Sequence, residues 1–362
     1  MKHARGVRRS FGILLIACVA AVALAVPPLA PRVGTTATAS AATAVAGPKG
    51  VGSQQPGIAF ESAGAMGRDL DAIRAAGMTW VRADFFWYAI QAFGRNSYDW
   101  RSTDAFVKAA RARHLNVLAL VAFSPAWARR GKSTTDPPDN PADYATFVHA
   151  AAKRYAPMGV HAWEIWNEPN QGVFWSPKAD PVAYAALLKK AYPAIKSADR
   201  KAIVITGGLA PASNNGRDVS PESFVTNIYW HGAKGNFDAV GLHPYSFPYA
   251  PMYRATWNTF YRTPDIHAVM QAAGDGNKQV WGTEIGYPTG TNSKAVSDSQ
   301  QAKYLVDAIA AWRKWSFAGP LFIFRLRDSS SDKGNVDDNM GLFRVSGQPK
   351  PSYSAVRRKL RP

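Results

Sequence analysis

Two short acidic segments of the chain carry side chains suited to acid–base chemistry. Residues 164–170 read Glu-Ile-Trp-Asn-Glu-Pro-Asn, and residues 283–288 read Thr-Glu-Ile-Gly-Tyr-Pro. Each lies at the end of an apolar run that predicts a β-strand. Cleavage of a glycosidic bond needs one protonated carboxyl group for the leaving oxygen and one ionised carboxylate for the anomeric centre. We therefore take Glu168 and Glu284 as the candidate catalytic pair.

Polar side chains at the ends of neighbouring apolar runs would complete such a site. An arginine beside Glu284, such as Arg82, would lower the pKa of this carboxyl and keep it charged. Glu168, in a less polar setting, would have a raised pKa and stay protonated. The structural alternative is an ion pair of Arg82 with Asp84 or Glu164. The remaining polar candidates, for which a plain turn or packing at the rim is the alternative, are Asn167, His243 and Tyr245.

Three tryptophans near these segments are candidate sugar platforms. Flat indole rings bind the apolar faces of sugars through contact and burial. Large aromatic side chains also fill cores, so packing is the alternative for each of them. The three candidates are Trp127, Trp166 and Trp175.

These residues have to be positioned by an alternation of short apolar runs with amphipathic helical stretches. Such an alternation, eight times over, predicts an α/β fold, a (β/α)8 TIM barrel with one catalytic domain, whose functional side chains lie at the carboxyl ends of the strands. An open doubly wound sheet would need a Gly-rich loop after the first strand, and residues 61–64 do not form one. The predicted strands are 57–61, 79–85, 116–123, 161–167, 203–208, 237–243, 279–284 and 320–326.

The predicted strand also distinguishes Glu168 from a second nearby carboxylate that could be taken for the catalytic one. Glu164 lies four residues earlier on the same predicted strand, so it shares a face with Glu168 but lies deeper in the barrel. We predict that Glu164 forms a structural ion pair inside the barrel.

The two acidic motifs support a resemblance to a known group of enzymes. Trp166-Asn167-Glu168-Pro169-Asn170 and Thr283-Glu284-Ile285-Gly286 resemble the motifs of clan A, the retaining glycoside hydrolases on TIM barrels. Within this clan the chain is most similar to families 39 and 5. Residues 341–353 resemble the segment that leads into the last helix of those families. The resemblance spans roughly residues 57–360.

The resemblance implies a role for each polar candidate. Glu168 matches the general acid/base, and Glu284 matches the nucleophile. Asn167 matches the residue that hydrogen-bonds the sugar 2-hydroxyl. Arg82 and Tyr245 match groups that hold the nucleophile ionised and oriented. His243 matches a histidine found in part of the clan.

The end of the last predicted strand departs from the pattern of the clan. Many members carry a tryptophan there, whereas this chain has Phe324-Arg325-Leu326-Arg327. Two alternatives follow: Phe324 replaces the tryptophan, or Arg325 or Arg327 reaches the site and suits an anionic sugar.

No motif for a cofactor or a metal is visible in the sequence. The seven histidines are scattered without ligand spacing such as His-x-x-x-His. The single cysteine, Cys18, excludes a disulfide framework and a cysteine-based metal site. We predict no cofactor and no metal.

The beginning of the chain has the pattern of an export signal. Four basic residues precede an apolar run over 11–26, and small residues follow. We predict a signal peptide over residues 1–41, a flexible tether over 42–56 and the catalytic domain over 57–362. An uncleaved membrane anchor and a lipoprotein acylated at Cys18 are the alternatives. The predicted location is extracellular or cell-wall associated.

The charge of the chain bears on its partners. Lys and Arg number 43 against 25 acidic residues, which gives +18, and loss of the five basic residues within 1–41 leaves +13. No basic run is interleaved with aromatic residues, so we predict no nucleic-acid partner. The expected partners are a β-linked glycan and, through loose attraction, an anionic cell envelope; we expect a monomer.

These observations together predict a secreted retaining β-glycosidase that hydrolyses a poly- or oligosaccharide. Transglycosylation at the same site is one alternative, because a sugar hydroxyl can replace water as the acceptor. A carbohydrate-binding or cell-wall-binding protein without turnover is the other.

Overall fold

A computed structural model describes residues 47–361 of the chain. The predicted signal peptide, 1–41, and the first part of the predicted tether, 42–46, lie outside the described residues. Within the described part, no helix combines the length and the apolar character needed to cross a bilayer.

Eight parallel strands close into a barrel, so the predicted (β/α)8 fold is confirmed. Each strand pairs with its neighbours in chain order, and β8 pairs with β1. The strands are β1 Val51–Gln54, β2 Trp80–Phe86, β3 Asn116–Ala122, β4 Ala162–Ile165, β5 Ile203–Thr206, β6 Ala239–Leu242, β7 Gln279–Ile285 and β8 Ala318–Phe324.

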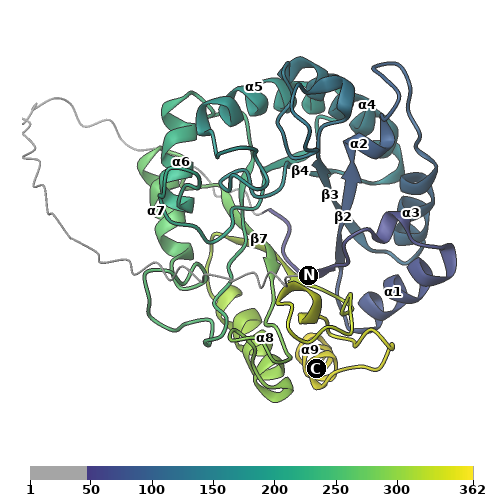
Figure 1. Ribbon diagram of the computed structural model, residues 1–362, viewed down its shortest axis with the longest axis vertical. Helices are drawn as coiled ribbons and strands as arrows, with labels where there is room; N and C mark the ends of the chain where they lie inside the picture. Colours follow the sequence, from purple (N-terminus) through teal and green to yellow (C-terminus); the bar gives the residue numbers. More distant parts are fainter. Residues whose placement is uncertain (1–46, 362) are drawn as a thin grey trace, which may run out of the picture. The chain divides into compact units, whose positions relative to one another are not determined.

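Helices surround the barrel, and in Figure 1 they form a ring around the strands. Several begin with a capping side chain followed by proline; Asp180 and Ser220, for example, accept hydrogen bonds from the first turns of α5 and α6. The helices are α1 Ala63–Ala75, α2 Trp87–Ile90, α3 Arg101–Ala112, α4 Pro141–Tyr155, α5 Pro181–Ala198, α6 Pro221–Trp230, α7 Thr263–Ala272, α8 Asp298–Trp312 and α9 Pro351–Leu360.

The first strand does not lie where the sequence predicts it. Residues 58–60 form a single 3-10 turn, and β1 lies at Val51–Gln54, inside the predicted tether. This strand lacks an apolar side chain at position 52 because a Cβ at Gly52 would collide with the ring of Phe322 and the Cβ of Trp80. Ser53 donates a hydrogen bond to the Ile323 carbonyl. The barrel therefore begins before Gly57, and the predicted boundary at 56/57 is wrong.

The interior of the barrel is layered. An apolar cluster contains residues of seven different strands, Trp80, Leu118, Ala162, Ile205, Ala239, Trp281 and Phe322. Arg82 on β2 and Glu164 on β4 lie two residues after the members of this cluster on the same strands. They point inward and form a fully buried ion pair. Side chains two residues apart on a strand share a face, so β2 and β4 pass from the apolar level to a polar one. The polar level supports the mouth of the barrel.

Candidate active site

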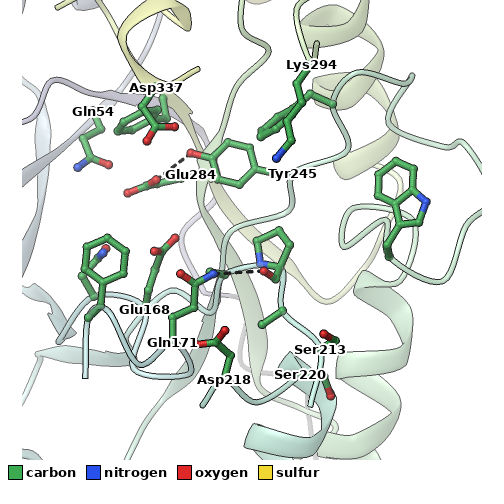
Figure 2. Close-up of a pocket in the computed structure, with 18 of the residues that line it drawn as sticks. Gln54, Glu168, Gln171, Ser213, Asp218, Ser220, Tyr245, Glu284, Lys294 and Asp337 are labelled. Carbon is green, nitrogen blue, oxygen red and sulfur yellow. Dashed lines mark hydrogen bonds between the residues drawn. The ribbon is translucent and has the colours of Figure 1, made fainter. Parts of the chain in front are cut away.

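A cleft of about 1240 Å³ lies at the carboxyl ends of the strands. Its lining comes from almost every part of the barrel mouth: Gln54 ends β1, Asp84 lies near the end of β2, and Glu284 lies near the end of β7. Glu168 and Tyr245 follow β4 and β6. Figure 2 shows the side chains of Gln54, Glu168, Tyr245 and Glu284 facing one space. The position agrees with the rule that TIM-barrel sites form at this face.

Glu168 is held by a sharp turn after β4. Trp166 and Glu168 both have left-handed backbone angles, with φ of 71° and 44°. Such angles cost roughly 1–3 kcal/mol each in residues other than glycine, and they persist only where the surroundings hold them. The Glu168 amide donates to the Gly208 carbonyl at 3.1 Å. The buried Asn170 side chain donates to the carbonyls of Ala210 and Val219. The turn thereby aims Glu168 into the cleft.

Glu284 accepts hydrogen bonds from two partners predicted from the sequence. Arg82 Nη1 lies 2.5 Å from Glu284 Oε1, and the Tyr245 hydroxyl lies 2.8 Å from Oε2. Burial alone would raise the pKa of Glu284. The opposing charges of His243 and Arg82, together with these hydrogen bonds, outweigh it and hold the pKa below the usual value for a glutamate. Glu284 is therefore ionised at neutral pH.

Glu168 has the opposite electrostatic setting. Burial raises the pKa of its carboxyl above the usual value, and the nearby charge of Glu284 adds to this effect. His243 opposes the rise, because its Nδ1 lies 2.7 Å from Glu168 Oε1. A raised pKa on Glu168 and a lowered one on Glu284 separate a proton donor from a nucleophile.

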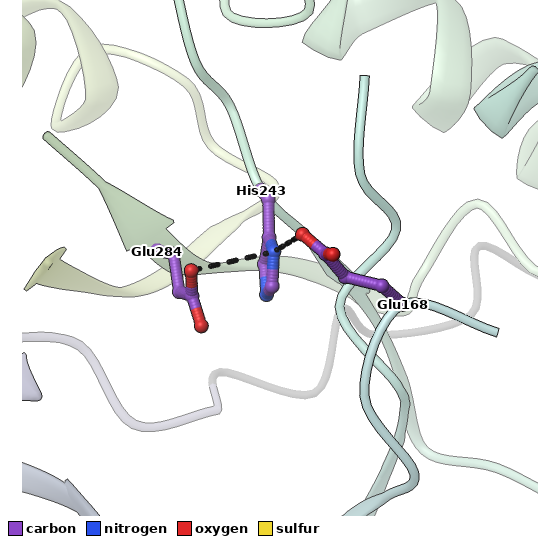
Figure 3. A group of neighbouring side chains, drawn as sticks. All are labelled: Glu168, His243 and Glu284. Atoms are coloured by element: carbon purple, nitrogen blue, oxygen red, sulfur yellow. Dashed lines mark hydrogen bonds and ion pairs between the residues drawn. The ribbon is translucent and has the colours of Figure 1, made fainter. Parts of the chain in front are cut away.

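His243 lies between the two carboxylates, as Figure 3 shows. Its Nδ1 is 2.7 Å from Glu168 and 3.6 Å from Glu284 Oε2. Burial lowers the pKa of His243, but the two neighbouring carboxylates outweigh it and raise the pKa overall. The ring packs directly against Gly208, where a Cβ would collide with His243 Nε2 and the Thr283 hydroxyl. Glycine at 208 is therefore required for this position of the ring.

Arg82 joins the core to the site. Its Nε lies 2.6 Å from Glu164 and its Nη2 lies 2.9 Å from Asn167 Oδ1. Arg82 also contacts Gln54 and Glu284. The predicted ion pair of Glu164 inside the barrel is present, and the same arginine also contacts the candidate nucleophile Glu284.

Replacement of Arg82 with methionine should destabilise the protein by about 3–5 kcal/mol, because Glu164 and Glu284 would be left buried without their cation. Urea denaturation followed by circular dichroism measures this loss. The matched control is Arg101→Ala, which removes a surface partner of Asp99 and should cost no more than about 1 kcal/mol. Equal stability of the two variants would contradict this account of the buried pair.

The three tryptophans predicted as sugar platforms do not line the cleft. Trp166 and Trp175 are buried and pack edge to face on each other. Trp127 packs on Trp87 and donates to the Gln91 carbonyl. The structure gives no support to the platform prediction: Trp166 and Trp175 are buried, and Trp127 is half-buried with Arg95 over its ring, outside the lining of the cleft. The aromatic side chains that do line the cleft are Phe86, Phe123, Phe174, Tyr245, Phe247, Tyr249, Trp257 and Phe324.

The end of β8 resolves the alternatives left open for it. Phe324 lines the cleft, whereas Arg325 and Arg327 do not. Arg325 donates to the Ser329 hydroxyl at 2.7 Å, and Arg327 pairs with Asp69 at 2.5 Å. The geometry therefore gives no support to recognition of an anionic sugar by either arginine.

Among the polar residues of the cleft wall that the sequence did not reveal, three lie close to Arg82 or Glu284. Gln54 and Asp84 are buried, and Asp84 accepts a hydrogen bond from the Gly57 amide. Asp337 comes from the loop after β8 and lies beside Glu284 in Figure 2. The alternation of β2 offered a signal for Asp84, which lies two residues after Arg82 on the same face. Gln54 lies outside the predicted strand, and Asp337 belongs to no periodic pattern.

Glu168, His243 and Glu284 also bring one possible ligand atom each within 4.8 Å of the others. Both oxygens of Glu284 already accept hydrogen bonds, one of them from the Arg82 cation. His243 Nδ1 is engaged by Glu168. The positive charge of Arg82 would repel a metal cation, and the atoms that could ligate it are already hydrogen-bonded. The arrangement therefore suits proton transfer better than binding of a metal.

The sequence matches the description of a known enzyme family, which assigns the chain to that family. The family model described as cellulase (glycosyl hydrolase family 5) matches residues 49–319. The chain belongs to glycosyl hydrolase family 5. The suspected resemblance to clan A is thereby confirmed. No curated protein matches the sequence significantly.

Solved structures similar to this family 5 chain come from families 39 and 5. A family 39 glycoside hydrolase from Bacteroides cellulosilyticus is 25% identical with a TM-score of 0.69, over 81% of this chain and 60% of that one. A monomeric beta-xylosidase from Caulobacter crescentus is 20% identical with a TM-score of 0.65, over 85% and 66%. A subfamily 18 member of family 5 from Streptomyces cattleya, in complex with GlcNAc, is 18% identical with a TM-score of 0.68, over 87% and 80%. The chain thus spans less than two thirds of the first two structures.

Proposed function

We propose that the protein is a retaining β-glycosidase that hydrolyses O-glycosidic bonds of a β-linked poly- or oligosaccharide by double displacement. The observation that carries the proposal is the short approach of the two carboxylates: one oxygen of Glu168 and one of Glu284 lie within 4.8 Å. Retaining enzymes have carboxyl groups about 5–5.5 Å apart, whereas inverting enzymes leave roughly 6.5–9.5 Å for a water. Membership of family 5 supports the proposal.

In the first step, an oxygen of Glu284 attacks the anomeric carbon, and the bond to the leaving oxygen breaks. Glu168 donates its proton to that oxygen, so the leaving group departs as an alcohol. In the second step, Glu168, now ionised, takes a proton from water. The resulting hydroxide displaces Glu284, which returns the configuration at the anomeric carbon to its starting state.

Asn167 has the geometry to bind a sugar hydroxyl. Its Oδ1 accepts a hydrogen bond from Arg82, which fixes the amide so that the Nδ2 donor is left for a ligand. Asn167 lines the cleft directly before Glu168. This arrangement supports the binding of the 2-hydroxyl implied by the resemblance.

The proposal is tested by the configuration of the first product. Nitrophenyl β-glucosides, β-xylosides and β-mannosides, with cello-oligosaccharides, form a panel suggested by the family and by similar structures of a xylosidase, a glucosidase and a mannosidase. For a cleaved substrate, proton NMR during the first minutes should show the β-anomer. Initial release of the α-anomer would exclude double displacement, and the Glu284→Ala variant is the control for background hydrolysis.

The pH profile of activity should be bell-shaped. The shifted pKa values of Glu284 and Glu168 set its acidic and basic limbs. Activity falls at low pH as Glu284 gains a proton, and its lowered pKa places this limb below the ordinary value of 4.5. Activity falls at high pH as Glu168 loses its proton, and its raised pKa places that limb above 4.5. His243 lowers the pKa of both groups.

The variant His243→Asn should therefore move both limbs of the kcat/KM profile to higher pH. His267→Asn, a change on α7 away from the cleft, is the matched control and should leave both limbs in place. Movement of the two limbs in opposite directions in His243→Asn would contradict the electrostatic account.

We also propose that the protein is exported and works outside the cell or at its wall, with loose attraction to an anionic envelope. The support is the basic and apolar pattern within residues 1–41 and the charge of +18. Sequencing of the mature amino terminus from culture medium tests the export, and the salt dependence of wall binding tests the attraction.

A further inference from the structure

We infer that the face of the barrel opposite the cleft docks on a bilayer surface that carries anionic phospholipid head groups. This amino-terminal face consists of residues 47–50 and of the loops that lead from a helix into the next strand. It lies opposite the cleft because the cleft is at the carboxyl ends of the strands. The inference rests on the proposed export and glycosidase activity and deepens them, since it names the surface of the envelope and directs the cleft away from it.

The exposed charge of the amino-terminal face is positive. Basic residues in the last turn of a helix are favoured by the helix dipole, so they are set aside. The loops and residues 47–50 still contain six exposed cations, namely Lys49, Arg200, Lys201, Lys234, Arg313 and Lys314. The dipole does not account for these residues, because they lie beyond the ends of the helices.

The acidic residues of the same face do not offset this charge. Within the described residues they are Asp199, Asp238 and Asp275, and none of them is exposed. Each lies within 2.8 Å of a basic side chain, in the pairs Asp199–His161, Asp238–Lys196 and Asp275–Lys278. Exposed acids do occur in loops that follow strands, at Asp139, Asp332 and Asp337. A negative surface would therefore orient the molecule with the amino-terminal face toward it.

The spread of the exposed cations fits a planar partner. They precede β1, β5, β6 and β8, and β1 lies across the closed barrel from β5. A linear polyanion follows a stripe or a groove, whereas charges on opposite sides of a face contact a flat surface together. A bilayer with anionic lipids is such a surface, and each lysine or arginine close to it adds to the attraction.

An exposed tryptophan at the edge of the face suits the same partner. Trp230 is the last residue of α6 and is 77% exposed. The loop that follows it carries Lys234, and Lys189 Nζ donates to the carbonyl of His231 at 3.2 Å. Tryptophan is enriched at the membrane–water interface, where its ring lies at the level of the head groups. Trp230 among these lysines therefore adds an apolar contact to the electrostatic one.

The chain also enters the barrel at this face. A Cβ at Gly47 would collide with the side chain of Gln279, the first residue of β7, so Gly47 lies at the amino ends of the strands. Residues 1–46 precede it in the sequence and contain the basic residues and the apolar run predicted to direct export. A chain attached to a bilayer through that run would present the amino-terminal face to the bilayer and the cleft to the glycans beyond it.

The test measures binding to lipid vesicles by co-sedimentation. The chain from Ala42 onward is used, because it contains the complete closed barrel with its core and lacks the apolar run, which would insert into any bilayer. Phosphatidylglycerol mixed with phosphatidylcholine supplies the anionic surface, and pure phosphatidylcholine is the neutral reference. Affinity for the anionic vesicles should be at least about tenfold higher, and it should be lost at about 1 M salt, where charges are screened.

Charge reversal on the two faces separates docking from an effect of net charge. One variant combines four changes on the amino-terminal face, Lys49→Glu, Arg200→Glu, Lys201→Glu and Lys314→Glu, and should bind the anionic vesicles at least about tenfold more weakly. The matched control reverses four exposed cations in loops that follow strands, Lys132→Glu, Lys178→Glu, Arg217→Glu and Arg254→Glu. It has the same net charge and should retain affinity within about threefold. Circular dichroism verifies that both variants are folded.

Three results would overturn the inference. The first is equal weakening in the two variants, and the second is equal binding to neutral and anionic vesicles. The third is tighter binding of the amino-terminal face to soluble polyphosphate than to vesicles, which would make a linear polymer the partner.

The activity and the export are measured separately from vesicle binding. Binding that depends on the amino-terminal face, in a protein that cleaves no glycoside of the panel, would retain the docking surface and reject the activity. Cleavage without such binding would reject the docking surface alone. Recovery of the protein only from the cell interior would reject the export.

Discussion

Replacement of Glu284 with alanine should lower kcat by at least about 10⁴-fold, because it removes the ionised carboxylate that is proposed to attack the anomeric carbon. Glu284 is the ionised member of the pair, oriented by Arg82 and Tyr245. The loss should apply to substrates with good and poor leaving groups alike, since both require the attack. Initial-rate kinetics on the cleaved member of the glycoside panel measure the effect.

The fold should survive this change, because Arg82 keeps its buried partner Glu164. Circular dichroism and thermal unfolding of the variant provide that control. Asp307→Ala, a surface change on α8 that removes a partner of Lys303, is the matched variant and should retain full activity. Turnover by a folded Glu284→Ala variant within tenfold of the wild type would reject Glu284 as the nucleophile.

Replacement of Glu168 with alanine should have an effect that depends on the leaving group. Substrates with a poor leaving group need the proton of Glu168, so their kcat/KM should fall about 10²–10⁴-fold. Dinitrophenyl glycosides leave without protonation, so formation of the glycosyl–Glu284 intermediate should remain fast while its hydrolysis slows. A burst of dinitrophenol followed by a slow steady rate is the expected time course.

Azide should rescue this variant, because the anion needs no general base and can enter the space vacated by the carboxylate. The expected product is the β-glycosyl azide, identified by NMR. A uniform loss on all leaving groups, with no rescue by azide, would show that Glu168 is not the acid/base. The Glu284→Ala variant treated in the same way distinguishes the two roles, since azide attack there would give the α-glycosyl azide.

The barrel and the position of the candidate catalytic pair could be predicted because two independent signals agree, the apolar runs of the strands and the rule for strand ends. Parallel strands buried on both faces read as apolar runs, and β3, β7 and β8 lie within two residues of their predicted bounds. Glu168 and Glu284 follow from the rule that strand ends carry the chemistry of a TIM barrel. Arg82 and Tyr245 contact Glu284 as the resemblance implies.

Other features depend on contacts between distant parts of the chain and were not accessible to pattern reasoning. β1 consists of Val-Gly-Ser-Gln, and Trp80 and Phe322 pack so closely on Gly52 that a Cβ there would collide with both side chains. The positive φ of Trp166 turns its ring away from the cleft and toward Trp175. The aromatic residues that line the cleft lie largely in irregular loops, where no period marks them.

The buried side chain of Asn170 has a consequence for redesign of this enzyme. It exchanges hydrogen bonds with Ala210 in both directions and donates to Val219, so it fastens the turn of the proton donor to both ends of the segment that leads into α6. Grafting a foreign loop between residues 210 and 219 would therefore misplace the acid unless these three anchoring contacts were retained. A change of loop at this wall of the cleft is therefore also a change in the support of Glu168.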